Sequence, residues 1–224
     1  MKILIKFPSR SRPEKFFKTV DNIFAHLANK QDYLISATLD DNDLTMRSVE
    51  ALRKIDMLEK TINFEVVWGR SRNKVDACNR GINLKFPWDI VVLISDDMQI
   101  IAHGFDDLIR RDFKMEDSLD RVIHYKDGFE HDPIISFPVI GRLWFNHYGY
   151  IYPPMYISLF CDEELYLVAQ QRGKLYTSDF NIVKHNHPTW IGGVVDAQLR
   201  GSESFHPIDK QTFEKRKRNN FFIK

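Results

Sequence analysis

The sequence predicts an α/β protein in which helices cover both faces of a mostly parallel central sheet. Three observations lead to this fold class. Short runs rich in Val and Ile alternate with segments of helical periodicity through the first half of the chain. The spacing between these runs leaves room for a crossover helix, as βαβ units require. The chain also has 224 residues, 43% of them hydrophobic, which is enough to bury a substantial core.

Four apolar runs in the first half are expected to form strands, and three segments between them are expected to form helices. The strands are predicted at residues 1–7, 33–39, 62–68 and 90–95. The helices are predicted at residues 11–27, 45–60 and 74–84. The first helix follows a capping-box pattern that runs from Ser11 to Glu14, with Pro13 in its first turn.

The second half is less regular. It contains an apolar segment at 134–140, an aromatic segment at 144–156 and a helix predicted over 162–172. Tyrosines at 148, 150 and 152 alternate as they would in a strand with one buried face. No repeat or flexible linker interrupts the chain, so we expect a single domain over 1–224. Its halves are residues 1–101 and 102–206, and a basic tail follows at 207–224.

Composition excludes several classes of protein. The formal net charge of +1 argues against a surface that is basic all round and binds nucleic acid everywhere. Two cysteines, Cys78 and Cys161, are too few for a disulfide framework and favour a reducing compartment. No apolar run resembles a signal peptide or approaches the ~20 residues of a membrane span. We therefore expect a cytoplasmic protein.

Polar residues follow each predicted strand of the first half. Because ligands of open α/β sheets bind beyond the carboxyl ends of the strands, these residues are expected to cluster at one edge. The four groups are Pro8-Ser9-Arg10, Asp40-Asp41, Gly69-Arg70-Ser71 and Asp96-Asp97.

Several sequence motifs of other α/β proteins are missing. No G-x-G-x-x-G follows the first strand, and neither a P-loop nor a G-x-S-x-G nucleophile motif is present. These absences argue against dinucleotide-binding Rossmann domains, P-loop nucleotidases and α/β-hydrolases. The loop after the first strand also lacks glycine, which disfavours a nucleotidyltransferase that wraps a triphosphate there.

The adjacent carboxylates Asp96 and Asp97 end a buried strand. Such a pair suits a hard divalent cation, Mg²⁺ or Mn²⁺, that also binds substrate phosphates. The pair could instead cap a turn and face solvent. Its position in the sequence does not decide between these two interpretations.

The order of six short segments resembles that of a known family. The segments are SRSRPEKF, LDDND, GRSRNKVDACNRGI, LISDDM, FCDEEL and HNHP. Together, over residues 3–188, they resemble a GT-A glycosyltransferase of the family 2 type, in particular its compact branch from bacteria and phages. The resemblance implies a GT-A fold, in which residues 1–101 bind the nucleotide and residues 102–206 lie on the acceptor side.

The resemblance also implies a nucleotide site. The first loop and the acid after the second strand would hold the base and ribose, at Pro8, Ser9, Arg10, Arg12 and Asp40. Lys74 would contact the diphosphate or ribose. Asn79 belongs to a segment that resembles the family's A-R-N-x-G, with Cys78 in place of the usual arginine. Alternatively, Asp40 could form a turn and the two arginines could be solvated.

A metal site is implied by the match of Ile94-Ser95-Asp96 to the family's D-x-D, in which Ile94 replaces the first acid. Asp96 would then contact both the nucleotide and the metal, Mn²⁺ or Mg²⁺, with Asp97 in reserve. His187 in HNHP matches the histidine that completes the site, and His185 is the second choice. Both histidines could instead be solvated turn residues.

The catalytic base is implied at Asp162, which resembles the aspartate of the family's E-D motif. Cys161 stands in place of the glutamate. Glu164 or Glu163 is the alternative base. Asp162 would deprotonate an acceptor hydroxyl, giving inversion without a covalent intermediate. Apart from the resemblance, Asp162 could simply be the N-cap of the following helix.

The function implied is a metal-dependent, inverting transfer of sugar from a nucleotide sugar, first of all a UDP-sugar, to an acceptor hydroxyl of unknown identity. A nucleotidyltransferase and a nucleotide-sugar-binding protein without catalysis are the alternatives.

Some of the six aromatic residues in 144–156 are expected in the core and one or two beside the acceptor. The tail from Lys210 to Lys224 has six basic residues and one acid, so contact with nucleic acid or an anionic membrane surface is a further hypothesis. Most such runs are solvated helix faces. We expect the tail to affect acceptor recruitment or solubility and not donor binding.

Overall fold

The central sheet is mixed but mostly parallel. The computed structural model describes residues 1–82, 85–116, 118–128, 133–186 and 197–222. Within them, seven strands form one sheet in the order β3-β2-β1-β4-β7-β6-β8. The strands are β1 (Ile3–Pro8), β2 (Tyr33–Asp40), β3 (Phe64–Gly69), β4 (Ile90–Leu93), β6 (Val122–Tyr125), β7 (Val139–Gly141) and β8 (Leu175–Ser178). Only β7 runs antiparallel to its neighbours in this described sheet, so the predicted α/β class is confirmed.

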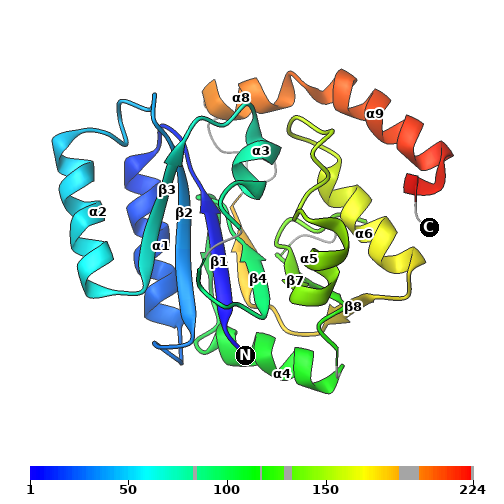
Figure 1. The fold of residues 1–224 in the computed structure, drawn as a ribbon, viewed down its shortest axis with the longest axis horizontal. Helices are drawn as coiled ribbons and strands as arrows, with labels where there is room; N and C mark the ends of the chain where they lie inside the picture. Colours follow the sequence, from blue (N-terminus) through cyan, green and yellow to red (C-terminus); the bar gives the residue numbers. More distant parts are fainter. Residues whose placement is uncertain (83–84, 117, 129–132, 187–196, 223–224) are drawn as a thin grey trace.

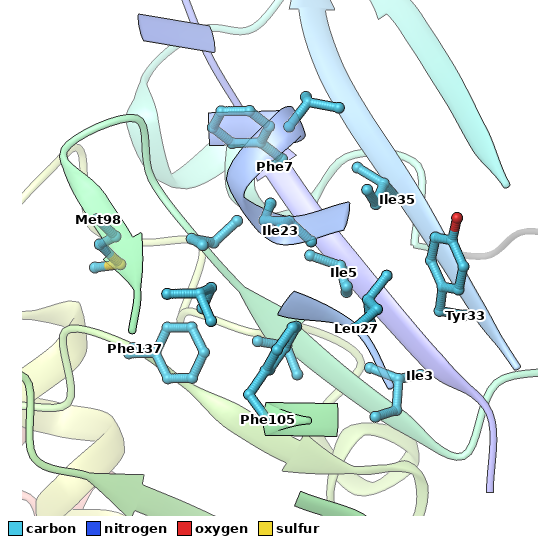
Figure 2. Packing of buried hydrophobic residues seen from close by; sticks show 14 of the residues in the cluster. Ile3, Ile5, Phe7, Ile23, Leu27, Tyr33, Ile35, Met98, Phe105 and Phe137 are labelled. Carbon is cyan, nitrogen blue, oxygen red and sulfur yellow. The ribbon is translucent and has the colours of Figure 1, made fainter. Parts of the chain in front are cut away.

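Helices cover both faces of the sheet, as predicted (Figure 1). One face packs against α1 (Pro13–His26), α2 (Val49–Thr61) and α4 (Phe105–Met115). The other face packs against α3 (Lys74–Asn79), α5 (Arg142–Tyr148), α6 (Cys161–Gln171) and α9 (His206–Arg218). The side chains of β1 explain this arrangement, because residues alternate between the two faces of a strand. Ile5 and Phe7 belong to the first core, which Figure 2 shows, and Leu4 belongs to the second.

Smaller elements complete the described chain. β5 (Met98–Ile100) pairs antiparallel with β9 (Val183–His185) in a separate two-stranded sheet. The remaining elements are α8 (Ala197–Glu203) and the 3₁₀ turn η1 (Asn220–Phe222). The β5–β9 pair matters for the site, because it brings a segment late in the chain beside the end of β4.

The first helix does not begin as the sequence pattern predicted. Ser11 has a left-handed backbone with φ of 59°, and Arg12 is the N-cap, without a side-chain cap hydrogen bond. The Ser11 N–H instead donates to Asp43 at 2.6 Å. The predicted capping box is therefore wrong, although Pro13 does occupy the first turn of α1.

Two other predicted helices are shorter in the structure. α2 begins at Val49 instead of residue 45, because Ser48 is its N-cap and its Oγ accepts from the Ala51 N–H at 3.2 Å. α3 ends at Asn79, and Gly81 follows with φ of +75°. Residues 83–84, at the end of the predicted helix, lie outside the described part of the chain.

The aromatic segment is not a strand. Residues up to Tyr148 form α5, and the following residues form a loop. Trp144, Tyr152 and Tyr156 are buried, as expected for some of the aromatic residues, whereas Tyr150 is partly exposed. The apolar segment at 134–140 yields only the short β7.

The basic tail is a packed helix. Asp209 and Phe213 of α9 are buried, and Arg216 turns inward, with its side chain only 12% exposed. The exposed charges of α9 are Lys210, Glu214, Lys215, Lys217 and Arg218. Contact of these charges with nucleic acid or a membrane surface stays a prediction.

β4 and β7 pair directly, so both halves of the chain contribute to the same sheet. We propose on this basis that residues 1–224 form a single domain. Among the described helices, none is both long and apolar enough to span a bilayer.

Candidate active site

The polar residues predicted at the strand ends lie together at one edge of the sheet. Ser9, after β1, donates its hydroxyl to Asp96, after β4, at 3.0 Å. The backbone N–H of Ser71, after β3, donates to Asp40 at the end of β2 at 2.8 Å. Because β1 to β4 are parallel, their carboxyl ends meet at the edge where α3 lies (Figure 1). The expected clustering is confirmed.

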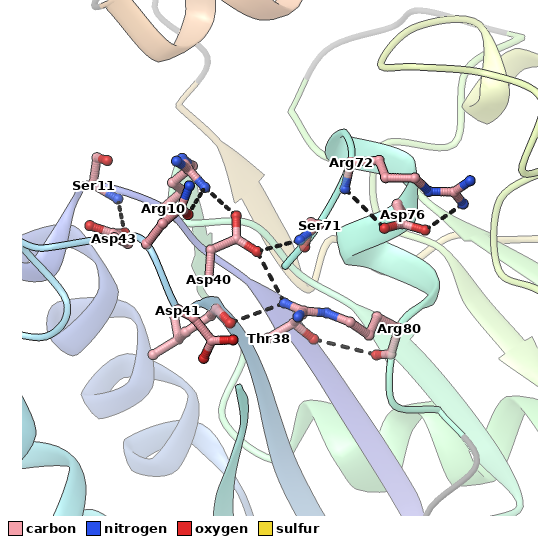
Figure 3. Close-up of polar contacts among 12 residues, drawn as sticks. Arg10, Ser11, Thr38, Asp40, Asp41, Asp43, Ser71, Arg72, Asp76 and Arg80 are labelled. Atoms are coloured by element: carbon pink, nitrogen blue, oxygen red, sulfur yellow. Dashed lines mark hydrogen bonds and ion pairs between the residues drawn. The ribbon is translucent and has the colours of Figure 1, made fainter. Parts of the chain in front are cut away.

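Asp40 is enclosed by donors, as Figure 3 shows. One carboxylate oxygen accepts from the Ser71 N–H and from Nη2 of Arg80 at 3.2 Å, and the other is bound by Arg10. Burial favours the neutral acid, but the bonds from Ser71 and the charge of Arg10 hold the pKa of Asp40 below its ordinary value. Asp40 is therefore an ionised carboxylate that is already paired within the protein.

Asp96 is held in a similar way by the first loop. Its Oδ2 accepts from Ser9, and its Oδ1 accepts from Nη1 of Arg12 at 2.8 Å. Burial raises the pKa of Asp96, and the nearby charge of Asp97 adds to that rise, whereas Arg12 lowers it. Both oxygens of Asp96 thus have donors in the loop that follows β1.

Asp97 lies beside His185 instead. Asp97 Oδ2 is 3.4 Å from Nε2 of His185, and Nδ1 of His185 is 3.2 Å from Oδ2 of Asp127. The pairing of Met98 with His185 in the β5–β9 sheet sets this approach. The backbone N–H of Asn186 also donates to the Asp97 carbonyl at 2.7 Å.

Because of this arrangement, Asp97 and His185 each shift the pKa of the other. Burial alone would raise the pKa of Asp97, but the contact with His185 lowers it below the ordinary value. Burial would lower the pKa of His185, but Asp127 and Asp97 raise it to about 9. The imidazole therefore carries the local positive charge at neutral pH. His187, the first choice from the sequence, lies outside the described residues.

Lys74 and Asp162 extend the site toward the second half of the chain. Lys74 is the first residue of α3, whose N-cap Asn73 accepts from the Asp76 N–H at 2.8 Å. Lys74 keeps an exposed surface although many protein atoms surround it. Desolvation lowers its pKa, but acidic groups close by raise the pKa more. These groups are Cys78, Cys161, Asp162 and Asp97.

Asp162 lies one residue inside α6 and is not its N-cap. Phe160 occupies the N-cap position with φ of 63°, so the N-cap alternative is wrong. Burial raises the pKa of Asp162, and Lys74 and the N–H of Glu163 partly offset that rise. A carboxylate with a raised pKa is a stronger base than a solvated one.

Two other predicted site residues, Asn79 and Glu164, form hydrogen bonds to other parts of the protein. Asn79 Oδ1 accepts from the backbone N–H groups of Ile151 and Tyr152, and its Nδ2 donates to the Tyr152 carbonyl at 2.6 Å. Asn79 therefore fixes the 151–152 loop, which favours a structural role over nucleotide contact. Glu164 accepts two hydrogen bonds from Arg216. Pro8 ends β1 beside Thr38, so it shapes the backbone from which Ser9 projects.

Arg80 and Lys6, at the same edge, were not predicted from the sequence. Nζ of Lys6 donates to Thr38 at 2.6 Å and to the Arg80 carbonyl at 2.9 Å. Arg80 approaches β3 so closely that a Cβ on Gly69 would lie 2.1 Å from its Nη1. The sequence does contain a signal for Lys6, which stands inside the apolar run ILIKF. Because charged residues are rarely buried without a partner, a lysine at this position indicates a buried polar contact.

The described residues offer a partial metal site. They contain no group of three or more His, Cys, Asp or Glu side chains placed to hold an ion. Asp97 and His185 supply two ligand groups, and Asp127 on the far nitrogen is the kind of partner that orients a metal-binding imidazole. Mg²⁺ and Mn²⁺ commonly bind through one or two carboxylates with phosphate and water completing the shell. These residues therefore fit a cation that arrives with a diphosphate and displaces the proton from Nε2 of His185, because only a neutral imidazole nitrogen binds a metal.

Comparison with known proteins supports the fold. No protein-family model matches the sequence, and no curated protein matches it significantly. Among solved structures, S. aureus TarS 1-349 matches 84% of this chain and 61% of its own, with a TM-score of 0.65 and 11% identity. The same protein in complex with UDP-GlcNAc matches 82% of this chain and 58% of its own, with a TM-score of 0.63 and 13% identity.

A mannosyltransferase from Pyrobaculum calidifontis, PcManGT, in complex with GDP-Man and Mn²⁺, is similar to the same degree. It matches 83% of this chain and 56% of its own, with a TM-score of 0.65 and 12% identity. The chain thus spans less than two thirds of these proteins. The likeness confirms the GT-A-like fold. Membership of family 2 stays a prediction.

Proposed function

We propose that the chain is a glycosyltransferase that moves a sugar from a nucleotide-sugar donor to an acceptor hydroxyl. One observation carries the proposal. Asp96 and Asp97, which follow β4, contact Arg12 and His185 from distant parts of the chain at the carboxyl edge of a GT-A-like sheet. That edge is where such sheets bind ligands.

The donor would lie across the ends of β1 to β4. We assign the base and ribose to the surface formed by Ser9, Asp40 and Asp96, which Arg10 and Arg12 hold in place. Arg10 is paired with Asp40, and Arg12 is paired with Asp96. We therefore propose that the two arginines mainly position these carboxylates. Lys74 retains an exposed surface and would donate to the diphosphate.

We assign Mn²⁺ or Mg²⁺ to Asp97 and His185, with His187 as a further candidate. Asp96 was the first choice from the sequence, but one of its oxygens is held by the cationic side chain of Arg12. Asp97 accepts from the hydroxyl of Ser95 with one oxygen, and its other oxygen faces His185, which can itself bind the ion. When bound, the cation would neutralise charge that develops on the departing nucleoside diphosphate. Metal dependence is part of this proposal.

Asp162 would be the general base. Its carboxylate takes the proton of the acceptor hydroxyl while the acceptor oxygen forms a bond to the anomeric carbon. The bond between that carbon and the diphosphate oxygen breaks in the same step, and the nucleoside diphosphate leaves. Direct displacement inverts the anomeric configuration and requires no covalent enzyme intermediate.

The donor is proposed to be a UDP-sugar. The solved structures of TarS with UDP and with UDP-GlcNAc support this choice, while that of PcManGT with GDP-Man makes a GDP-sugar the second candidate. We propose the cytoplasm as the location, in agreement with two cysteines that are both free and buried. The acceptor is a hydroxyl compound that the site chemistry alone does not identify.

A thermal-shift screen tests the proposal directly. UDP-, GDP-, dTDP- and CMP-sugars are added with Mn²⁺ or with a chelator, and the melting temperature is measured. Ligands that bind the folded state raise its apparent stability by mass action, so the donor should stand out in the presence of Mn²⁺. Release of nucleoside diphosphate from that donor then measures turnover. If no nucleotide sugar binds, the proposed function is wrong.

The two alternatives give different results in the same assay. A nucleotidyltransferase would release pyrophosphate from a nucleoside triphosphate and a sugar phosphate. A binding protein without catalysis would bind the donor but release no nucleoside diphosphate, with or without added acceptors.

A further inference from the structure

Asp209 in the first turn of α9 is completely buried, and its carboxylate accepts three backbone hydrogen bonds. The N–H of Ile157 donates to Oδ1 at 2.9 Å, and the N–H groups of Ser158 and Leu159 donate to Oδ2 at 2.8 Å each. A buried carboxylate is costly unless donors replace its water, and here backbone groups of one short loop supply them. Asp209 therefore fixes residues 157–159, although Ser158 and Asp209 are 51 residues apart in the sequence.

The same loop connects to both sides of the candidate active site. Its Ile157 carbonyl accepts from the N–H of Val75, the residue after Lys74, at 3.3 Å. At its other end the loop leads through Phe160, in a left-handed conformation, into the first turn of α6, which carries Asp162. Movement of the loop would therefore change the positions of Lys74 and Asp162 relative to each other.

The helix that carries Asp209 is itself anchored. Arg216 binds Glu164 through two hydrogen bonds of 2.7 Å, and the ring of Phe213 lies 5.4 Å from that of Phe160. Figure 1 shows α9 alongside α6 at the end of the chain. Asp209 is thus held at a fixed place on the folded body.

We propose that Asp209 is a positioning residue for sugar transfer, which sets the 157–159 loop so that Asp162 and Lys74 keep their places around the reacting groups. The inference rests on the proposed function. It assigns part of the basic tail to the active site, whereas the sequence suggested a role only in acceptor recruitment or solubility. Asp209 itself does not touch the reacting atoms.

The variant Asp209→Asn tests the proposal with little change of volume. The amide keeps one acceptor oxygen, but its NH₂ group faces a backbone N–H that needs an acceptor, so the loop loses at least one hydrogen bond. A displacement of about 1 Å at a catalytic group can lower turnover by roughly 10²-fold, so we expect kcat to fall at least about tenfold. Affinity for UDP with Mn²⁺, measured by calorimetry, should fall by less than kcat, because Lys74 is only one of the groups that we assign to the donor.

Ile55→Ala is the matched control. Ile55 lies on α2 in the core on the other face of the sheet, so its truncation lowers stability and leaves the three hydrogen bonds of Asp209 in place. Both variants should lower the melting temperature, but only Asp209→Asn should lower kcat when assayed well below that temperature. Should Asp209→Asn fail to fold, Asp209→Glu keeps both acceptor oxygens and shifts the loop by a methylene group, and the same fall in kcat is expected.

Hydrogen–deuterium exchange gives a readout that does not depend on turnover. Faster exchange at residues 157–159 in Asp209→Asn, together with reduced kcat, supports the proposal. Faster exchange with unchanged kcat overturns it, as does an equal loss of kcat in Ile55→Ala. If the parent protein binds and turns over no nucleotide sugar, the proposed function fails first and the positioning role fails with it.

Discussion

Glu164 and Arg216 form a buried, bidentate ion pair that joins α6 to α9. Nε and Nη2 of Arg216 each donate to a different carboxylate oxygen at 2.7 Å, and the hydroxyl of Tyr156 adds a third bond at 2.7 Å. The Glu164 side chain is only 2% exposed. With both of its oxygens occupied, Glu164 serves as an anchor, which leaves Asp162 as the base that we propose.

Arg216→Ala should be strongly destabilising. Removal of one partner leaves the other charge buried and unpaired, which typically costs about 3–5 kcal/mol. The double variant Glu164→Gln with Arg216→Met should be more stable than Arg216→Ala alone, because no unpaired charge remains. Urea unfolding measures these differences, with the exposed Lys215→Ala as control. An Arg216→Ala protein as stable as the control would show that the ion pair contributes nothing.

Asp162→Asn should lower turnover while the donor still binds. Loss of a general base typically reduces the rate by roughly 10²–10⁴-fold. Affinity for UDP and the melting temperature should stay close to those of the parent, because Asn keeps the size of the side chain. Release of nucleoside diphosphate measures the effect, and Glu164→Gln is the comparison. Full turnover in Asp162→Asn would transfer the role of base to Glu163, or to Glu164 if Glu164→Gln is inactive.

Asp97→Asn should remove the gain in UDP affinity that Mn²⁺ provides. An amide oxygen is a weaker ligand for a hard cation than a carboxylate, and the pairing of Asp97 with His185 would also weaken. Calorimetry with UDP in the presence of Mn²⁺ or of a chelator measures this gain. Asp96→Asn is the matched variant, and we expect it to weaken UDP binding under both conditions. If Asp96→Asn alone abolishes the metal effect, the original assignment from the sequence is correct.

The buried Lys6 should make stability depend on pH in the alkaline range. Burial lowers the pKa of Lys6 from 10.5 to about 8. Between these values the unfolded chain binds more protons, so the free energy of unfolding rises with pH by up to about 1.4 kcal/mol per unit. In Lys6→Met this contribution disappears, so its stability relative to the parent should be greatest below pH 8 and should decline toward pH 10.5.

Urea unfolding of Lys6→Met and the parent across this range measures the difference. The exposed Lys18→Met is the control and should show no such trend. A constant difference between Lys6→Met and the parent would mean that Lys6 keeps its ordinary pKa in the folded protein.

Hydrophobic periodicity predicted the first half of the fold well. The four parallel strands and the helices between them follow from alternation and spacing within short windows, where local sequence and burial agree. Helix boundaries were less accurate, because they depend on contacts that the local pattern does not contain. Ser11, for example, donates its N–H to Asp43 and therefore does not cap α1.

The second half was harder to predict for a related reason. β7 has three residues and pairs antiparallel with a strand that lies much earlier in the chain. The tyrosines at 148, 150 and 152 alternate as in a strand, yet the chain there leaves α5 at Gly149, which has φ of +76°. A strand or helix of only a few residues is too short to show a clear hydrophobic periodicity, so its sequence does not predict which element it packs against.

The sequence is enough to predict that carboxylates stand at the ends of buried parallel strands, because strands and the polar residues that follow them are visible in short stretches of sequence. The partner that each carboxylate takes depends on the folded structure and could not be predicted from the sequence. Arg12 reaches Asp96 across 84 residues of sequence, and Asp209 lies 51 residues from Ser158. These pairings matter for stability, because a buried carboxylate is costly unless it finds hydrogen-bond donors within the folded chain. Such donors become neighbours only when the sheet and its helices have assembled.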